Sequence, residues 1–300
     1  MPRITKAEVA AFEADFRTRY LPLAKKLKKV EDDIYRLLIR SMANAEMSTA
    51  YWNIQKVKLN VLYKEMNILF ADWAKVQVPA RYKRSLKLIA QRISATESII
   101  NIGRKGLTDL LATNASTQIV FGLYNSAVES FLSSSLAGRR ALRNLFISTQ
   151  QTLVNESLVN VAVATGFQMG DLRQAKTLLK SIFESPGWNT VENKYFVQAG
   201  SKRYKAHYYA EMVARTKFHQ AHSQATLMQA NNYGTDLVQI SSHNTTTAIC
   251  IPFEGNIYSV KGGHPVFPPL SDTPPYHPNC LHLMYPTFES GLIAQGIKVA

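Results

Sequence analysis

Proline divides this chain of 300 residues into two parts of different character. None occurs between Pro22 and Pro79 or between Pro79 and Pro186, whereas eight of the twelve prolines follow residue 250. Because proline breaks the interior of a helix, the proline-free stretches are where long helices can form. The sequence around Pro79, VQVPARYKRS, is expected to interrupt the helical pattern. The distribution predicts long helices first and loops afterwards.

Apolar periodicity supports helices in the first part of the chain. One series of apolar residues recurs at alternating intervals of three and four, which places it on one helix face: Leu59, Leu62, Met66, Leu69 and Trp73. After Gly234, the β-branched runs LVQISS and NIYSV are typical of strands, and KGGHPVFPPLSDTPPYHPN is typical of loops. We therefore predict a mainly α fold: an elongated helical N-terminal body, then a small α+β C-terminal module with short strands and Pro/Gly-rich loops.

A turn-forming sequence, SPGW, marks the expected junction between two domains. A basic helical body is expected over residues 1–185 and a C-terminal module over residues 186–300. The module is expected to comprise a long helix at 202–233 and a strand and loop unit at 237–300.

Positive charge is concentrated in the first 220 residues. The chain has 35 basic and 21 acidic residues, of which two basic and four acidic ones follow residue 220. Basic surface attracts polyanions through a salt-sensitive term that is independent of sequence, although a solvated helix face is the alternative. The candidate contacts to nucleic acid or to a partner form three clusters: Lys25, Lys26, Lys28, Lys29, Arg81, Lys83, Arg84, Lys87, Lys202, Arg203 and Lys205.

Membrane and secretion signals are absent from the sequence. No apolar run reaches the ~18 residues that a membrane helix needs. The first residues, MPRITKAEVAAFEADF, carry acidic side chains early and contain no apolar secretion segment. We expect synthesis in the cytosol and no membrane span.

Both cysteines, Cys250 and Cys280, and all seven histidines lie after residue 206. A reducing cytosol disfavours a disulfide, which leaves metal ligands or buried thiols as interpretations. Cys280 and His282 are one residue apart and point to the same face of an extended strand, while His243 and Cys250 would supply the other half of a zinc site. The alternative is that these side chains are only buried or hydrogen-bonded, because their spacing fits no standard zinc finger.

Polar residues share one stripe of the expected long helix. They are Tyr208, Glu211, Arg215, His219 and His222. We expect a solvated face, with docking of a partner or of the C-terminal module as the alternative. A buried Arg215 would bind backbone carbonyls or a carboxylate of the module.

The C-terminal sequence resembles a known family. SSHNTTTAICIPFEGNIYS, followed by NCLHLMYP, resembles the C-terminal signature of minor capsid proteins of tailed bacteriophages. The stretch YHPNC is similar to the His-Pro-x-Cys ending of the related Mu F-like head morphogenesis proteins. Ala214-Arg215-Thr216 is similar to an Ala-Arg-Thr-Glu segment of both groups, with Lys217 in place of the Glu. The resemblance covers residues 160–290.

The sequence also departs from the family pattern. Thr245 and Thr247 stand where many relatives carry Arg and a first Cys, and Leu281 stands where a basic residue is usual. The missing Cys leaves a mixed Cys/His site, with zinc as the candidate cofactor. The ligands that the resemblance implies are His243, Cys250, Cys280 and His282, with His277 in reserve.

The resemblance implies a structural protein of the phage head, not an enzyme. Such a protein would be present in the virion, and in the host cytoplasm during assembly. It would associate with the portal or the major capsid protein, and it could contact double-stranded DNA during packaging. No nucleophile elbow, phosphate loop or zinc-protease helix is present, so no catalytic residue is assigned. The alternative is a His-dependent nuclease or other metal-assisted hydrolase acting on nucleic acid through His243, His277 and His282.

Overall fold

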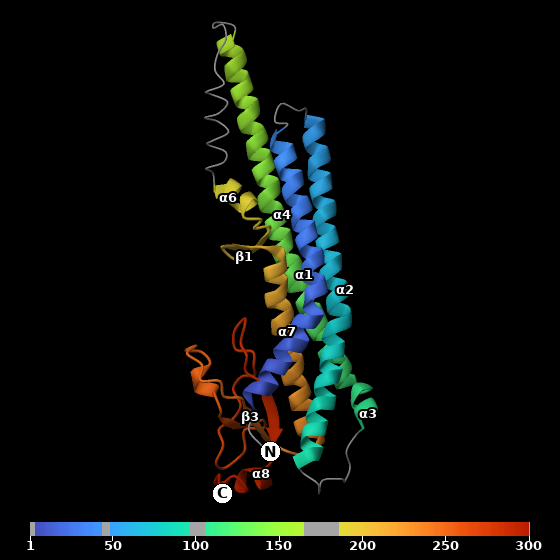
Figure 1. Ribbon diagram of the computed structural model, residues 1–300, viewed down its shortest axis with the longest axis vertical. Helices are drawn as coiled ribbons and strands as arrows, with labels where there is room; N and C mark the ends of the chain where they lie inside the picture. The colour runs from blue at the N-terminus through green and yellow to red at the C-terminus, as the bar shows by residue number, and fades with distance from the viewer. Residues whose placement is uncertain (1–3, 44–48, 97–105, 165–185, 300) are drawn as a thin grey trace. The chain divides into compact units, whose positions relative to one another are not determined.

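The protein is mainly helical, as the sequence predicts. A computed structural model describes residues 4–43, 49–96, 106–164 and 186–299 (Figure 1). Helix makes up 68% of it, with long helices first and short strands in small sheets towards the C-terminus. The expected domain boundary near residue 185 lies outside the described residues.

The helices and strands follow one another in a simple order. The helices are α1 (Lys6–Ala43), α2 (Thr49–Thr96), α3 (Leu107–Leu111), α4 (Asn114–Ala164), α6 (Pro186–Glu192), α7 (Ala206–Asn232) and α8 (Glu289–Ile293). The strands are β1 (Val197–Ala199), β2 (Lys202–Tyr204), β3 (Leu237–Ile240), β4 (Ile257–Ser259) and β5 (Met284–Thr287), and a 3₁₀ helix, η1, spans Ile251–Phe253. None of the helices in the described ranges has both the length and the apolar character needed to cross a membrane.

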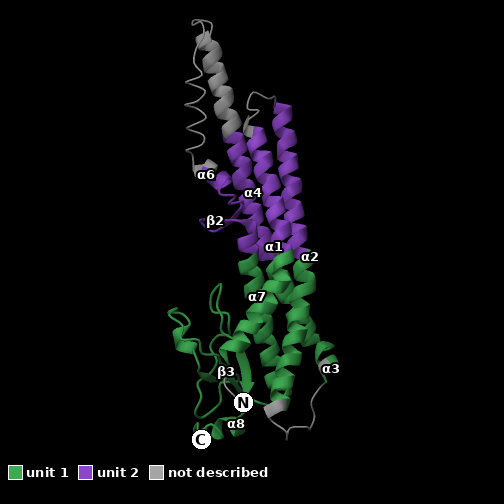
Figure 2. Ribbon diagram, in the orientation of Figure 1, with its two compact units in different colours: residues 1–22, 72–128, 211–300 green, residues 23–71, 129–210 purple. Residues whose placement is uncertain are grey.

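The chain forms two compact units, each built from separate segments (Figure 2). Unit 1 comprises residues 1–22, 72–128 and 211–300, and unit 2 comprises residues 23–71 and 129–210. Both units therefore draw residues from either side of position 185.

In unit 1 a capping box starts α1. Thr5 N–H donates to the Glu8 carboxylate at 2.7 Å, and Glu8 N–H donates to the Thr5 hydroxyl at 3.2 Å. These two bonds satisfy N–H groups that have no partner inside the helix. Phe16 then packs edge-on against Phe218 of α7, and Trp73 of α2 stacks on the same Phe218 ring. Burial of these aromatic side chains joins the three helices of unit 1.

The expected interruption at Pro79 is wrong. α2 runs unbroken through Pro79 to Thr96. A proline inside a helix costs about 3 kcal/mol. The neighbouring Val78 and Tyr82 are fully buried, and each buried apolar side chain contributes about 1.5–3 kcal/mol. Tertiary packing therefore outweighs the local cost of the proline.

The core face of α2 is rotated slightly from the expected stripe. Leu59 and Met66 are buried as expected, but Leu62, Leu69 and Trp73 are half-buried. The largest fully buried side chains of this helix within unit 2 are Trp52, Tyr63 and Phe70. Aromatic residues occupy the core positions because each of them removes more apolar area from water.

The long helix α7 begins a few residues later than expected. Residues 202–204 form β2, which pairs with β1 in an antiparallel hairpin of unit 2. At the start of α7, the buried Glu31 carboxylate accepts the His207 backbone N–H at 2.8 Å and lies 2.8 Å from His207 Nδ1. A carboxylate at a helix N-terminus caps free N–H groups and complements the helix dipole.

Gly234 ends α7, as its position in the sequence indicates. Its φ is +70°, and the N–H of Thr235 donates to the carbonyl of Ala230 at 3.0 Å. This is the Schellman arrangement, in which glycine takes the left-handed conformation. The chain then turns back as β3, the central strand of an antiparallel sheet in the order β4-β3-β5. The core of this part comprises Ala230, Val238, Ile240, Tyr258 and Met284.

Candidate metal centre

Three metal-ligating side chains meet beside the small sheet of unit 1. The Sγ atoms of Cys250 and Cys280 are 4.0 Å apart, and Cys280 Sγ lies 3.5 Å from Nδ1 of His282. The three ligand atoms all lie within 4.8 Å of one another. All three residues are buried, with exposed fractions of 1–3%. The structure thus groups two sulfurs and one imidazole nitrogen out of contact with water.

The spacing of these atoms suits a tetrahedral zinc ion. Zn–S and Zn–N bonds of about 2.3 and 2.05 Å at tetrahedral angles separate two sulfurs by about 3.8 Å and a sulfur from a nitrogen by about 3.6 Å. The observed 4.0 and 3.5 Å are close to these values. A disulfide needs a sulfur separation of about 2.05 Å, and both thiols are free.

Local turns position the two cysteines. The N–H of Cys250 donates to the Thr247 carbonyl at 2.8 Å, which forms a tight turn before η1. The N–H of Cys280 donates to the His277 carbonyl at 3.1 Å, in a turn where Asn279 has a φ of +70°. Asparagine tolerates this left-handed conformation better than most residues, which explains its place directly before Cys280.

The expected ligand His243 and the reserve ligand His277 lie outside this group of three. The His243 ring is 4.7 Å from the His282 ring, and its Nε2 is 2.7 Å from the Ser241 hydroxyl. His277 Nδ1 donates to the Pro278 carbonyl at 2.7 Å. The structure therefore brings together Cys250, Cys280 and His282, and it places His243 beside them with one ring nitrogen hydrogen-bonded elsewhere.

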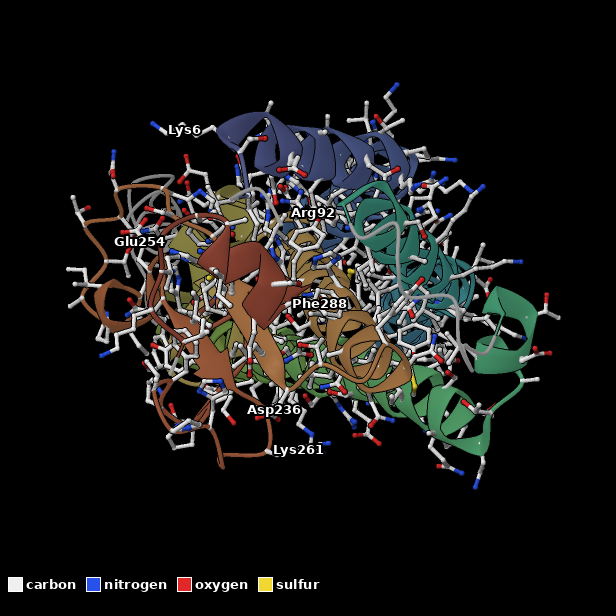
Figure 3. All side chains as sticks on the ribbon, turned by 90° about the horizontal axis from the view of Figure 1, so that it is seen from below. Lys6, Arg92, Asp236, Glu254, Lys261 and Phe288 are labelled. Atoms are coloured by element: carbon white, nitrogen blue, oxygen red, sulfur yellow. The ribbon has the colours of Figure 1, made fainter. Side chains whose placement is uncertain are left out.

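Glu254, labelled in Figure 3, belongs to the same centre and was missed in the sequence analysis. Its carboxylate accepts the backbone N–H groups of His243 and Thr245, the latter at 3.0 Å. Its Oε1 also lies 3.8 Å from His282 Nε2. The sequence does contain a signal that could have identified this residue, because Glu254 is the single Asp, Glu, Lys or Arg in the stretch from 241 to 260.

Burial sets the protonation of these groups. Burial and the neighbouring His243 lower the pKa of His282 to about 4, so the ring is neutral at neutral pH, as a metal ligand requires. Burial and the nearby Cys280 sulfur raise the pKa of Cys250 to about 12. Partial burial raises the pKa of Glu254, but hydrogen bonds from the His243 and Thr245 backbone outweigh burial and lower it overall.

Three residues of the polar stripe on α7, Arg215, His219 and His222, are buried, so the expected solvated face is wrong for them, whereas Tyr208 is exposed as expected. His222 Nε2 donates to the Met284 carbonyl at 3.1 Å, and Thr226 donates to the same carbonyl at 2.7 Å. Ser223 donates to the Pro274 carbonyl at 2.6 Å. Figure 1 shows β3 and its loops beside this helix. Buried carbonyls need donors, and α7 supplies them.

Arg215 and His219, from the same stripe, bind a carboxylate of α1. Arg215 pairs with Glu13, and with Glu211 at 2.8 Å. His219 Nε2 lies 3.1 Å from Glu13, while its Nδ1 is 3.4 Å from the carbonyl of His282. Burial raises the pKa of Glu13, but the His219 hydrogen bond and the Arg215 charge outweigh it, and the net shift is downward. The family-like Ala-Arg-Thr segment therefore joins α7 to α1.

The basic clusters differ in exposure. Lys25, Lys26, Lys28, Lys29, Lys83, Lys87, Lys202 and Arg203 are exposed, whereas Arg84 and Lys205 are half-buried. Arg81 is buried, lies 3.3 Å from the Asp15 carboxylate, and its guanidinium stands 3.6 Å over the Phe12 ring. Arg84 pairs with the same Asp15 at 3.4 Å. Arg81 therefore holds α1 and α2 together in unit 1 and is not available to a polyanion in this structure.

Comparison with known proteins identifies the family of this chain. Residues 25–291 match the family model described as phage minor capsid protein 2. No curated protein and no solved structure matches the chain. This family match defines a structural protein of a bacteriophage particle. The chain belongs to the phage minor capsid protein 2 family, whose members associate with other phage structural proteins in the virion.

Proposed function

We propose that this minor capsid protein lies next to the portal in the phage head and contacts the packaged double-stranded DNA. The lysine-rich face of α1, defined as Lys25, Lys26, Lys28 and Lys29, carries the proposal. Family membership supplies the context, because a head protein works beside densely packed DNA.

The lysine-rich face is open to a polyanion. All four side chains are exposed, while the residues between and beside them, Leu27 and Val30, are buried. Among the described residues, no carboxylate forms an ion pair with any of the four. At 100° per residue the four lysines span an arc of about 160° on the helix surface. An unneutralised basic face of this kind favours contact with phosphates.

DNA binding by the purified protein tests this proposal. Each phosphate contact contributes about −0.9 to the slope of log affinity against log salt. Replacing the four lysines with Gln should make the slope less steep by up to about 3.6. The matched control replaces four exposed lysines outside the three basic clusters: Lys6, Lys58, Lys64 and Lys75. A flat salt dependence, or equal losses in both variants, contradicts the proposal.

An exposed apolar stripe on α2 supports contact with another head protein. Ile54, Val57, Val61 and Ile68 recur at helical spacing within unit 2, and 48–61% of each residue is exposed. Exposed apolar patches on soluble proteins mark interaction sites. We assign this stripe to the portal, one of the two partners that the family resemblance implies, the other being the major capsid protein.

Cross-linking within purified particles tests the portal assignment. Cysteine introduced at Val61 should cross-link to the portal protein, whereas cysteine at the exposed Leu88 of α2 serves as the control. Cross-links from position 61 to the major capsid protein alone would overturn the portal assignment.

A further inference from the structure

We propose that Cys250 Sγ, Cys280 Sγ and His282 Nδ1 bind one zinc ion, and that Glu254 orients the His282 ring. The proposal is independent of portal or DNA contact. It concerns what holds the C-terminal loops of unit 1 in place.

The hydrogen-bonding state of His282 supports Nδ1 as the ligand. Its Nε2 is buried and has no hydrogen-bond partner within the part of the chain that the structure describes. A ring that gives its Nδ1 lone pair to a metal must carry its proton on Nε2. The Glu254 carboxylate, 3.8 Å from Nε2, is then in place to accept this proton in a hydrogen bond after a small approach. Metal-bound histidines commonly donate their second nitrogen to a carboxylate in this way.

Glu254 is itself held in position. The backbone N–H groups of His243 and Thr245 donate to its two oxygens. A carboxylate fixed by backbone donors cannot turn away without losing these bonds. The loop from Ser241 to Glu254 therefore holds a ready acceptor for the second nitrogen of His282.

The donor set selects the metal. Two thiolates and an imidazole suit zinc, whereas magnesium and calcium prefer oxygen ligands. Two thiolates also neutralise the charge of a zinc ion, so its burial leaves no net charge from these groups. His243 Nε2 bonds to Ser241, so we place His243 outside the ligand set.

A metal at this place would close a long loop. Residues 260–283 contain no helix and no strand, although Ser259 bonds to Pro268 and Leu270 across the loop. Ligands at positions 250 and 280 bracket this segment. Linking them restricts the unfolded chain and favours the folded loop.

Zinc content is the first measurement. The 300-residue chain, produced with zinc in the medium and dialysed against metal-free buffer, should contain one zinc ion per molecule. Cys250→Ser, Cys280→Ser and His282→Ala should each lose it. The matched controls His277→Ala and His243→Ala should keep it. Metal-free wild-type protein, or equal loss in the control variants, overturns the proposal.

Cobalt substitution and chelation test the assignment in protein that folds. Cobalt(II) in place of zinc should give thiolate-to-cobalt absorption that each cysteine substitution reduces. Glu254→Gln should retain one zinc ion but release it to a chelator at about 10- to 100-fold lower chelator concentration. Chelation should also speed protease cleavage within residues 260–283 in wild type. Cobalt spectra without thiolate absorption would contradict the assigned cysteine ligands. Release of zinc from Glu254→Gln at the same chelator concentration as from wild type would contradict the role of Glu254.

Discussion

Gly138, in the middle of α4, has no room for a side chain. A Cβ atom built at this position would lie 2.0 Å from the carbonyl oxygen of Phe196 and 2.7 Å from its carbonyl carbon. Both are backbone atoms, so a side-chain rotation cannot relieve the contact. The Phe196 side chain is fully buried, and its carbonyl accepts a hydrogen bond of 2.5 Å from the Tyr63 hydroxyl. We therefore expect Gly138→Ala to destabilise unit 2.

The expected size follows from opposing terms. Alanine improves helix propensity over glycine by about 1 kcal/mol. Overpacking of a well-packed core costs about 1–3 kcal/mol, and loss of the buried Tyr63 hydrogen bond adds about 1 kcal/mol. The net expectation is a loss of about 2 kcal/mol in the free energy of unfolding. For a chain of this size, each kcal/mol corresponds to a fall of about 2–4 °C in Tm.

Gly122, also on α4, is the matched control. Among the described residues, no heavy atom outside the adjoining backbone of α4 lies within 4 Å of a Cβ built there. Gly122→Ala should therefore gain about 0.5–1 kcal/mol from helix propensity alone. Urea unfolding followed by circular dichroism measures both variants. If Gly138→Ala stabilises the protein as much as Gly122→Ala does, the close approach of Phe196 to α4 is wrong.

Three further predictions concern the buried His222, the ion pair of Asp15 with Arg81, and nucleic-acid cleavage. Burial, Arg81 and His219 lower the pKa of His222 well below its usual value. The unfolded state then binds more protons, so the free energy of unfolding should fall as pH drops below about 6.5, by up to about 1.4 kcal/mol per pH unit from this group. Urea unfolding measured at several pH values should show a shallower dependence of this free energy on pH in His222→Gln than in wild type. Asp15→Asn leaves the buried Arg81 without its carboxylate and should lower the free energy of unfolding by about 3–5 kcal/mol. The control Asp33→Asn, which breaks an exposed ion pair with Arg36, should lower it by less than about 1 kcal/mol. Equal losses in the two variants would contradict the buried pairing of Asp15 with Arg81. Labelled DNA and RNA incubated with the protein and zinc or magnesium should remain intact, and cleavage that disappears with the metal-site substitutions would favour the hydrolase alternative.

Local sequence was sufficient for features that depend on local physics. The proline-free stretches predicted the long helices, and Gly234 predicted the end of α7, because helix propensity and the left-handed cap act within a few residues. The spacing of Cys280 and His282 placed both side chains on one face, since alternation along an extended chain is also local.

Features that depend on distant partners could not be predicted in this way. His222 of the α7 stripe is buried against the carbonyl of Met284, which lies 62 positions further along the chain. Arg215 meets Glu13 across 202 positions, and nothing near either residue signals the other. Pro79 remains inside a helix because tertiary burial offsets its cost. The role of Glu254 depends on a turn that only the folded loop reveals.

The most direct test of a structural role is the composition of purified particles of the phage that encodes this chain. After nuclease and protease treatment of intact, DNA-filled heads, mass spectrometry should find peptides from α1, α4 and α7 at a constant ratio to the portal protein. Infectious particles that lack the chain altogether would contradict its role as a minor capsid protein.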